Sequence, residues 1–216
     1  DETIYEGAAA SGIVASSSTF YYDDPSDCSS PSRSKNQSPT QGNVTTIVRW
    51  LKEKAAGTAD PEVNMSYDSS GNLVCTRDPK GYVSRIVYDT GTNTYPTIAT
   101  NARGQQTTTQ YYDGVSTDNG LYGQPKSVID PNGAVTSTEY DTFGRPTKIM
   151  DPYGTTAAYG TRSISYENFG TVNSQKVVTY TTVDYATSAV IWSETYFDGF
   201  GRTIKTRTQG PDNKVI

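Results

Sequence analysis

One pattern of residues occurs twice in this chain with the same internal spacings. Tyr67-Asp68-Ser69-Ser70-Gly71 is followed by Asp78-Pro79-Lys80-Gly81, and Tyr140-Asp141-Thr142-Phe143-Gly144 is followed by Asp151-Pro152-Tyr153-Gly154. In both copies Gly lies four residues after Tyr, Asp-Pro begins eleven residues after Tyr, and the last Gly falls fourteen residues after it. A repeat of this length predicts an architecture made of successive copies of one supersecondary unit.

Partial copies extend the repeat over more of the chain. Paired aromatic and acidic positions begin at residues 67, 88, 112, 140, 166 and 197, in steps of 21 to 31 residues, so loops of variable length are expected between units. The copy at Phe197 has Phe in place of Tyr, and Tyr166-Glu167-Asn168-Phe169-Gly170 is a degraded copy. The repeat positions are Tyr67, Asp68, Gly71, Asp78, Pro79, Gly81, Tyr88, Asp89, Tyr112, Asp113, Asp130, Pro131, Gly133, Tyr140, Asp141, Gly144, Arg145, Asp151, Pro152, Gly154, Phe197, Asp198, Gly201 and Arg202.

Each repeat unit has the local chemistry of a β-hairpin. Asp-Pro-x-Gly suits a tight turn, because Pro presets φ, Gly accepts positive φ and Asp can bond backbone two residues further on. The run of Thr and Val that follows, as in 134–140, is typical of a strand, and 145–150 leads through a second strand to the next Asp-Pro. We therefore predict an all-β fold of antiparallel hairpin repeats that pair edge to edge into a curling sheet. The best helical candidate is 44–56, where a strand followed by a turn is equally compatible with the β-branched start.

Composition favours a folded, polar sheet and excludes some classes of partner. The chain has 17 Tyr, 33% hydrophobic residues, 11% aromatic residues and a mean hydropathy of −0.63. This aromatic content argues against disorder, and Tyr suits a sheet with one face lining a moderately polar space. A net charge of −5 and a pI near 4.8 leave no basic patch for nucleic acid. No apolar run approaches the roughly 20 residues of a membrane span.

Three segments are expected along the chain. Residues 1–22 are interpreted as a divergent N-terminal β segment, since Phe20-Tyr21-Tyr22-Asp23 resembles a repeat position. Residues 23–43 are rich in Ser and Pro and are predicted to be a loop or linker. Residues 44–216 form the repeat region. The chain begins at Asp1 without Met, and we expect it to be a piece of a longer polypeptide.

No catalytic residue, cofactor or metal ligand is predicted. The chain has no His, which excludes Ser-His-Asp, Cys-His and His-metal sites within it. Asp23-Asp24 could in principle perform acid–base chemistry, and Asp and Asn turns could bind Ca²⁺ weakly, but turn formation explains these carboxylates better. Gly-rich 198–202 lacks the helix and Lys of a phosphate loop. Arg145 and Arg202 are expected to bridge to carboxylates of neighbouring strands or to stack on Tyr rings.

Two further features involve covalent chemistry. Cys28 and Cys75 are 47 residues apart and could form a disulfide that fixes the 23–43 loop to the first repeat hairpin; two unrelated thiols are the alternative. Asn-x-Ser/Thr sequons occur at Asn36, Asn43 and Asn64, where they would be candidate glycan sites in a secreted eukaryotic protein and are otherwise chance occurrences.

The repeated Tyr-Asp-x-x-Gly-Arg/Asn…Asp-Pro-x-Gly motif resembles the YD repeats of Rhs proteins, toxin-complex cocoon subunits and teneurins. The resemblance covers about residues 64–216 and is closest at 67–81 and 130–154, with a weak similarity at 42–50 to sequence that enters such repeats. It implies a β-sheet ribbon that spirals into a hollow shell, which encloses a C-terminal toxic domain in bacterial members and supports extracellular adhesion in teneurins. The aspartyl self-cleavage motif and toxin domain of the bacterial members do not occur in this sequence.

The resemblance predicts a non-catalytic wall segment of a YD-repeat shell that encloses or presents a cargo or toxin domain. The alternative is an extracellular adhesion or carbohydrate-binding surface, on which Tyr67, Tyr88, Tyr112 and Tyr140 would face solvent. The expected partners are further repeats of the same parent chain, other copies or a capping subunit at the sheet edges, and an enclosed toxin domain. The expected location is secreted or at the cell surface.

Overall fold

Strands in this protein are arranged in the sheet in the order in which they occur in the chain, from β1 to β15. The computed structural model describes residues 2–6, 13–31, 40–51, 57–114, 119–153, 160–210 and 215, and none of these residues is helical. The all-β, antiparallel fold expected from the repeat is confirmed. Among the described residues no helix is long and apolar enough to cross a membrane.

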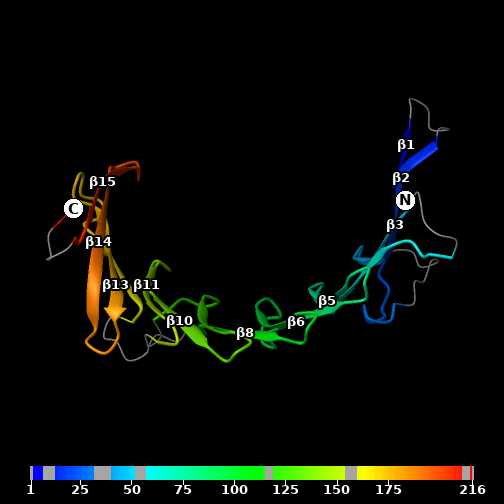
Figure 1. Cartoon of the computed structure of the whole chain (residues 1–216), viewed down its shortest axis with the longest axis horizontal. Coiled ribbons are helices and arrows are strands. Elements are labelled where there is room, and N and C mark those ends of the chain that lie inside the picture. The colour runs from blue at the N-terminus through cyan, green and yellow to red at the C-terminus, as the bar shows by residue number, and fades with distance from the viewer. Residues whose placement is uncertain are drawn as a thin grey trace. The chain divides into compact units, whose positions relative to one another are not determined.

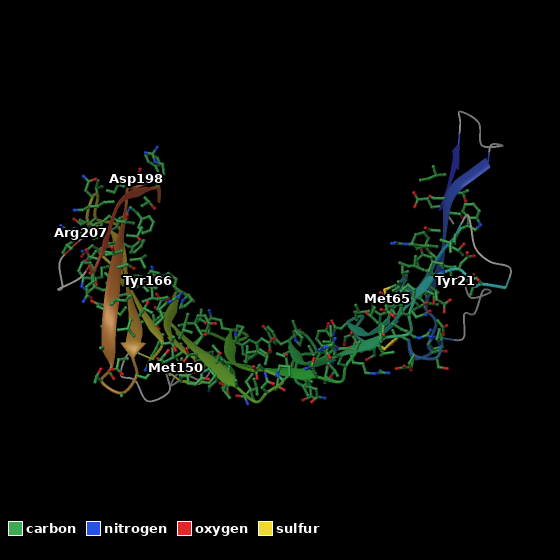
Figure 2. All side chains as sticks on the ribbon, in the orientation of Figure 1. Tyr21, Met65, Met150, Tyr166, Asp198 and Arg207 are labelled. Carbon is green, nitrogen blue, oxygen red and sulfur yellow. A yellow bond between two sulfur atoms is a disulfide. The ribbon has the colours of Figure 1, made fainter. Side chains whose placement is uncertain are left out.

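Two units make up the chain, Asp1–Gln106 and Thr107–Ile216, which we call unit 1 and unit 2 and describe separately. Figure 1 labels many of their strands, and Figure 2 adds the side chains to the same view. The strands of unit 1 are β1 (Glu2–Glu6), β2 (Ile13–Tyr22), β3 (Val44–Arg49), β4 (Glu62–Tyr67), β5 (Leu73–Arg77), β6 (Val83–Tyr88) and β7 (Pro96–Thr100). The strands of unit 2 are β8 (Gln106–Tyr111, which starts at the last residue of unit 1), β9 (Pro125–Ile129), β10 (Val135–Tyr140), β11 (Pro146–Met150), β12 (Arg162–Glu167), β13 (Lys176–Asp184), β14 (Ala189–Phe197) and β15 (Thr203–Thr208). The candidate helix at 44–56 is strand β3 over its first six residues, and 52–56 lie outside the described residues.

Few apolar side chains are buried in either unit. Of the described residues, Cys28, Cys75, Tyr112 and Val178 form the buried hydrophobic set. The largest fully buried side chains include the polar pair Thr46 and Asn64, where the Thr46 hydroxyl lies 2.8 Å from Asn64 Oδ1. A sheet with so small a core depends strongly on backbone ladders and on side chains that bridge neighbouring hairpins.

Turns alternate between two edges of each unit, because every strand runs antiparallel to the one before it. The turns that follow a Tyr-Asp position therefore share one edge, which we call the YD edge, and the Asp-Pro turns share the opposite edge, which we call the DP edge. In unit 2 the YD edge consists of 112–114 with 119–124, 141–145, 168–175 and 198–202, and the DP edge consists of 130–134, 151–153 with 160–161, and 185–188. In unit 1 the YD edge contains 68–72 and 89–95, and the DP edge contains 78–82 and 101–105.

Candidate functional site: the repeat turns and their tyrosines

One turn geometry serves both edges. An Asp or Asn at the first position accepts hydrogen bonds, through Oδ1, from the backbone N–H groups two and four residues later, at 2.8–3.1 Å. The fourth residue of the turn is a Gly with a positive φ, between 77° and 90°. This hairpin connection needs a left-handed backbone conformation at that residue, and Gly adopts it without strain. Turns of this kind begin at Asp68, Asp78, Asn101, Asp130, Asp141 and Asp198.

The Asn101 turn was not identified as a repeat position from the sequence. Its signal, Asn101-Ala102-Arg103-Gly104, has Asn in place of Asp, and it has Ala102 where the turns at Asp78 and Asp130 have Pro. Because Asn Oδ1 accepts the same two backbone hydrogen bonds, the substitution preserves the turn. A search for Asx-x-x-Gly would have found it.

Two aspartates hold longer connections on the YD edge of unit 1. The Asp23 carboxylate accepts the backbone N–H groups of 40–43 at 2.6–3.0 Å, which closes the long loop at its base. These bonds, led by those from Gln41 and Gly42, lower the pKa of Asp23 to about 2. Asp89 accepts the N–H groups of Thr92, Thr94 and Tyr95, and those bonds, with Tyr95 first, lower its pKa.

The short turns depress carboxyl pKa values for the same reason. In three of these turns the hydrogen bond from the backbone N–H four residues later is the largest cause of the lowered pKa. The donor is Asn72 for Asp68, Ala134 for Asp130 and Arg202 for Asp198. At Asp141 burial acts to raise the pKa, but the hydrogen bonds from Arg145 and Phe143 outweigh it and the net direction is downward. The turn geometry thus uses the ionised form of these acids.

Four repeat tyrosines tie their hairpin to the one before it. The hydroxyls of Tyr67, Tyr140 and Tyr166 donate to backbone carbonyls of earlier strands at 3.0–3.1 Å, and that of Tyr88 does so at 3.4 Å. The acceptor is always the residue that begins the second strand of the preceding hairpin, namely Val44, Pro125, Pro146 and Leu73 respectively. We call this contact the tyrosine tie. Burial raises the pKa of Tyr67, Tyr140 and Tyr166, and their hydroxyls remain donors at neutral pH.

A β-bulge accompanies the strand end on the YD edge. Register shifts occur between Ser66 and Tyr67, between Val87 and Tyr88, and between Glu139 and Tyr140. The shift is not required for the tie, because β12 pairs with β13 without a register shift at Tyr166, whose hydroxyl still donates to Pro146 O.

The sequence predicted that Tyr112-Asp113 is the Tyr-Asp pair after strand β8. In the structure the corresponding pair is Tyr111-Tyr112, one residue earlier. Tyr111 ends strand β8 opposite Pro125, and the backbone N–H of Tyr112 bonds to Gln124 O, as the Asp N–H does in the other turns. Tyr112 is 5% exposed, its hydroxyl donates to Thr138 O at 3.0 Å and its ring meets Tyr140 edge-on at 6.1 Å. Asp113 is exposed. The 24-residue and 28-residue steps on either side conceal this shift in the sequence.

Both repeat arginines pair with the aspartate of their own turn, and not with a neighbouring strand as expected. Arg145 Nε lies 2.7 Å from Asp141 Oδ2, and Arg202 Nε lies 2.7 Å from Asp198 Oδ2. The expected stacking occurs for Arg145, whose guanidinium carbon lies 4.0 Å from the Tyr166 ring centre. Arg145 therefore links its own turn to the next hairpin.

Cys28 and Cys75, whose pairing the sequence left open, form a disulfide with a Cα–Cα distance of 5.8 Å. The adjacent Asp27 makes a two-point ion pair with Arg85 of β6 at 2.8 and 2.9 Å, and this pair lowers the pKa of Asp27. Asp27 also lies beside the two sulfurs, but these are bonded to each other and leave no thiolate for a metal.

The remaining sequence candidates are placed as follows. Asn64 is fully buried, so its sequon is inaccessible in the folded chain, whereas Asn43 is half-buried and Asn36 lies outside the described residues. Gly154 also lies outside them, while Asp151 accepts the N–H of Tyr153. Asp23 and Asp24 line a polar cavity of about 230 Å³ with Tyr67 and Asp68, but the carboxylates of Asp23 and Asp68 are committed to backbone N–H groups.

Fold and turns together define a β-hairpin repeat protein. Residues 122–156 match the sequence model of the RHS Repeat family. A crystal structure of TcdB2-TccC3 is similar to the chain with a TM-score of 0.63 at 12% identity, over 92% of this chain and 13% of that one. A crystal structure of TcdB2-TccC3 without its hypervariable C-terminal region gives a TM-score of 0.63 at 10% identity, over 91% of this chain and 15% of that one. No curated protein matches the chain. The family-model match supports the YD/Rhs repeat resemblance of the sequence, and the similarity to the two crystal structures shows a shared fold over a small part of those chains.

Proposed function

We propose that this chain is a wall segment of a YD-repeat shell, where it encloses or presents a cargo or toxin domain and performs no catalysis itself. The observation that carries the proposal is the tyrosine tie. Tyr67, Tyr140 and Tyr166 each fasten a new hairpin to the one before it, so the sheet grows by one hairpin per repeat. The RHS Repeat match and the fold shared with TcdB2-TccC3 support this role.

The carboxylates support a non-catalytic role. Those of Asp68, Asp130, Asp141 and Asp198 each accept two backbone N–H groups of their own turns and have lowered pKa values. A general acid at neutral pH needs a raised pKa, so these groups are adapted to turn formation.

The tyrosines favour a wall over an adhesive surface. Ring platforms for sugars must be exposed, yet Tyr112 is buried and Tyr67, Tyr88 and Tyr140 are half-buried, with hydroxyls bonded to backbone carbonyls. These rings act within the sheet.

We propose three segments and a set of partners from the same features. Residues 1–22 supply β1 and β2 as a divergent β segment, 23–43 form a connecting loop, and 44–216 form the repeat sheet. The end strands β1 and β15 of the sheet order can pair with further repeats, another copy or a capping subunit. The buried Cys28–Cys75 disulfide supports a secreted or cell-surface location, since such bonds persist in oxidising compartments.

The test is the whole gene product that contains this sequence, purified and imaged by cryo-electron microscopy. The expected result is a closed, hollow sheet with the hairpins of this chain in its wall and one sheet face turned to the lumen. A solid particle, or a sheet with both faces open to solvent, would contradict the proposal.

A further inference from the structure

One position on the YD edge carries a side chain that reaches the following hairpin. It is the residue directly before the second strand of a hairpin, and we call it the linking residue. The side-chain amides of three linking residues donate to a backbone carbonyl in the next turn of the same edge. These donors are Asn72, which lies 2.6 Å from Asn93 O, Gln124, which lies 3.0 Å from Gly144 O, and Gln175, which bonds to Asp198 O.

Both glutamines use the two ends of their amide in the same way. Gln124 Oε1 accepts the backbone N–H of Leu121 at 2.7 Å, and Gln175 Oε1 accepts that of Gly170 at 3.5 Å. Because the oxygen is bonded within the turn, the Nε2 group is directed at the next turn. A Cβ at position 144 would lie 2.9 Å from Gln124 Nε2, so Gly144 leaves room for the amide.

Arg145 occupies the linking position of its hairpin and reaches forward through its ring contacts. Its guanidinium carbon lies 4.0 Å from the Tyr166 ring centre and 5.5 Å from that of Phe169, and both rings belong to the next hairpin. Arg202 ends a turn of the same geometry and makes the same bond to the Asp of its own turn, but no strand beyond β15 follows it in the described part of the chain. Its side chain is 75% exposed, against 35% for Arg145. The forward link therefore accounts for the lower exposure of Arg145.

Links and tyrosine ties meet at neighbouring residues of the chain. The linking residue reaches forward, and the tie from the next hairpin ends on the residue directly after it, which is Leu73, Pro125 or Pro146. At these three junctions two side chains of opposite direction join the same pair of hairpins. At the fourth junction the next hairpin carries Phe197, which has no hydroxyl, and the Gln175 link is present there.

The residues that end the DP turns differ in chemistry from the linking residues. Tyr82 is 58% exposed, Gln105 Oε1 accepts a side-chain hydrogen bond within its own turn, and Ala134 has no polar side-chain group. A contact of another kind joins two later DP turns, from the Tyr185 hydroxyl to Asp151 Oδ2 at 3.2 Å. The turns that end at residues 82, 105 and 134 all lie within the described residues and have no link of the YD kind.

We propose that the links and ties make the YD edge the fixed margin of the sheet in each unit, where successive hairpins keep their spacing, and that the DP edge is the margin at which hairpins separate. This difference goes beyond the proposed function, because it is a property of the sheet whether or not the sheet encloses a cargo. Proteins open locally where few contacts bridge neighbouring elements. A change in the curvature of the sheet is therefore expected to occur at the DP edge.

Hydrogen exchange of one backbone group compares the two edges directly. On both edges the turn Gly donates its N–H to the carbonyl of the Asp or Asn that begins the turn, at 2.9–3.1 Å. In the wild-type chain, exchange measured by NMR and corrected for intrinsic rates is expected to be about 2- to 10-fold slower on the YD edge, because an additional hydrogen bond must open there. The probes are Gly71 and Gly144 on the YD edge, and Gly81, Gly104 and Gly133 on the DP edge. Equal exchange on the two edges would overturn the proposal.

The variant Q124E tests a single link. Glu retains the oxygen that accepts from Leu121 but replaces the donor to Gly144 O by a second oxygen, so exchange at Gly144 is expected to become about 2- to 10-fold faster. Q105E is the matched control, since Gln105 ends a DP turn and uses its amide oxygen as an acceptor. It is expected to leave exchange at Gly104 unchanged, and circular dichroism verifies that both variants are folded. Unchanged exchange at Gly144 in Q124E, or an equal acceleration at Gly104 in Q105E, would reject the link.

A second pair of variants tests the arginine link. R145K and R202K each retain a cation beside the Asp of the turn, but Lys lacks the planar group that stacks on a ring. R145K is expected to accelerate exchange in the next turn, at Thr171, whose N–H bonds to Asn168 O. R202K is expected to leave exchange there as in the wild type. Equal exchange at Thr171 in the two variants would show that Arg145 does not fasten the next hairpin.

Discussion

At the scale of single residues, the turn aspartates accept backbone hydrogen bonds and the turn glycines adopt positive φ, so both residue types shape the hairpin turns. Asp141 shows the principle, since one side chain accepts the N–H groups of Phe143 and Arg145 and also holds the Arg145 guanidinium. A residue type that elsewhere marks a catalytic site is used here to close a hairpin, and its lowered pKa reports that use.

The backbone at Gly120 lies close to the Tyr112 ring, so a larger residue at position 120 is expected to destabilise the fold. A Cβ at this position would lie 2.2 Å from the Tyr112 ring, so G120A must displace the buried tyrosine. We expect a loss of about 1–3 kcal/mol in the free energy of unfolding, as for other overpacked sites. The measurement is urea denaturation followed by tyrosine fluorescence.

The control for this prediction is G199A in the 198–202 turn, where an added Cβ has no neighbour within 4 Å. It is expected to leave stability almost unchanged. Equal effects of G120A and G199A would show that the contact with Tyr112 does not constrain the fold.

At the scale of the hairpin, removal of a tyrosine tie is expected to weaken the coupling between the two hairpins that the tie joins. Y166F removes the hydroxyl that donates to Pro146 O while it retains the ring beneath the Arg145 guanidinium. The expected loss is about 0.5–1.5 kcal/mol in the free energy of unfolding, with faster hydrogen exchange in β11 and β12. Y153F, at a site that is 79% exposed, is the control and should behave like the wild type. Identical exchange in Y166F and Y153F would refute the tie.

The Cys28–Cys75 disulfide fastens the long loop between β2 and β3 to strand β5. It closes a loop of 47 residues, for which chain entropy predicts a stabilisation of about 4 kcal/mol. C28S/C75S should therefore unfold at lower urea concentration and should expose the described part of the loop to early proteolysis. The nearby Asp27–Arg85 pair is 46% exposed on each side, so R85Q should change stability far less. Comparable losses in the two variants would show that the disulfide is not the main fastening.

At the scale of the whole molecule, stability depends on many ionised turn acids and on little buried apolar surface. Every shifted Asp has a folded-state pKa below its ordinary value of 3.8, and that of Asp23 is about 2. The unfolded chain therefore binds more protons between these values, and the stabilisation is present above about pH 4 and is lost as the pH falls towards 2.

Thermal denaturation at a series of pH values tests this acid dependence. The melting temperature is expected to be nearly constant from pH 7 to pH 5 and to fall steeply between pH 4 and pH 2, because the turn carboxylates are protonated there. D23N should have a lower melting temperature at pH 7 and a shallower fall, since Asn cannot be protonated in this range. A melting temperature that stays flat down to pH 2 would exclude the turn acids as a source of stability.

The sequence alone determined the repeat, the turns and the all-β class, because these depend on local chemistry: Asp, Gly and Pro dictate backbone conformation within a few residues. It did not determine the partner of Arg145 or the one-residue shift at Tyr111, since both depend on the strand register. The Asn101 turn belongs with the local features, because its Asn-x-x-Gly signal is present in the sequence. Only the tertiary structure decided that Tyr166 reaches Pro146 and that Phe143, Phe169 and Phe200 share one edge. Such relations join residues that are far apart in the chain, and antiparallel pairing fixes them only when the hairpins have assembled.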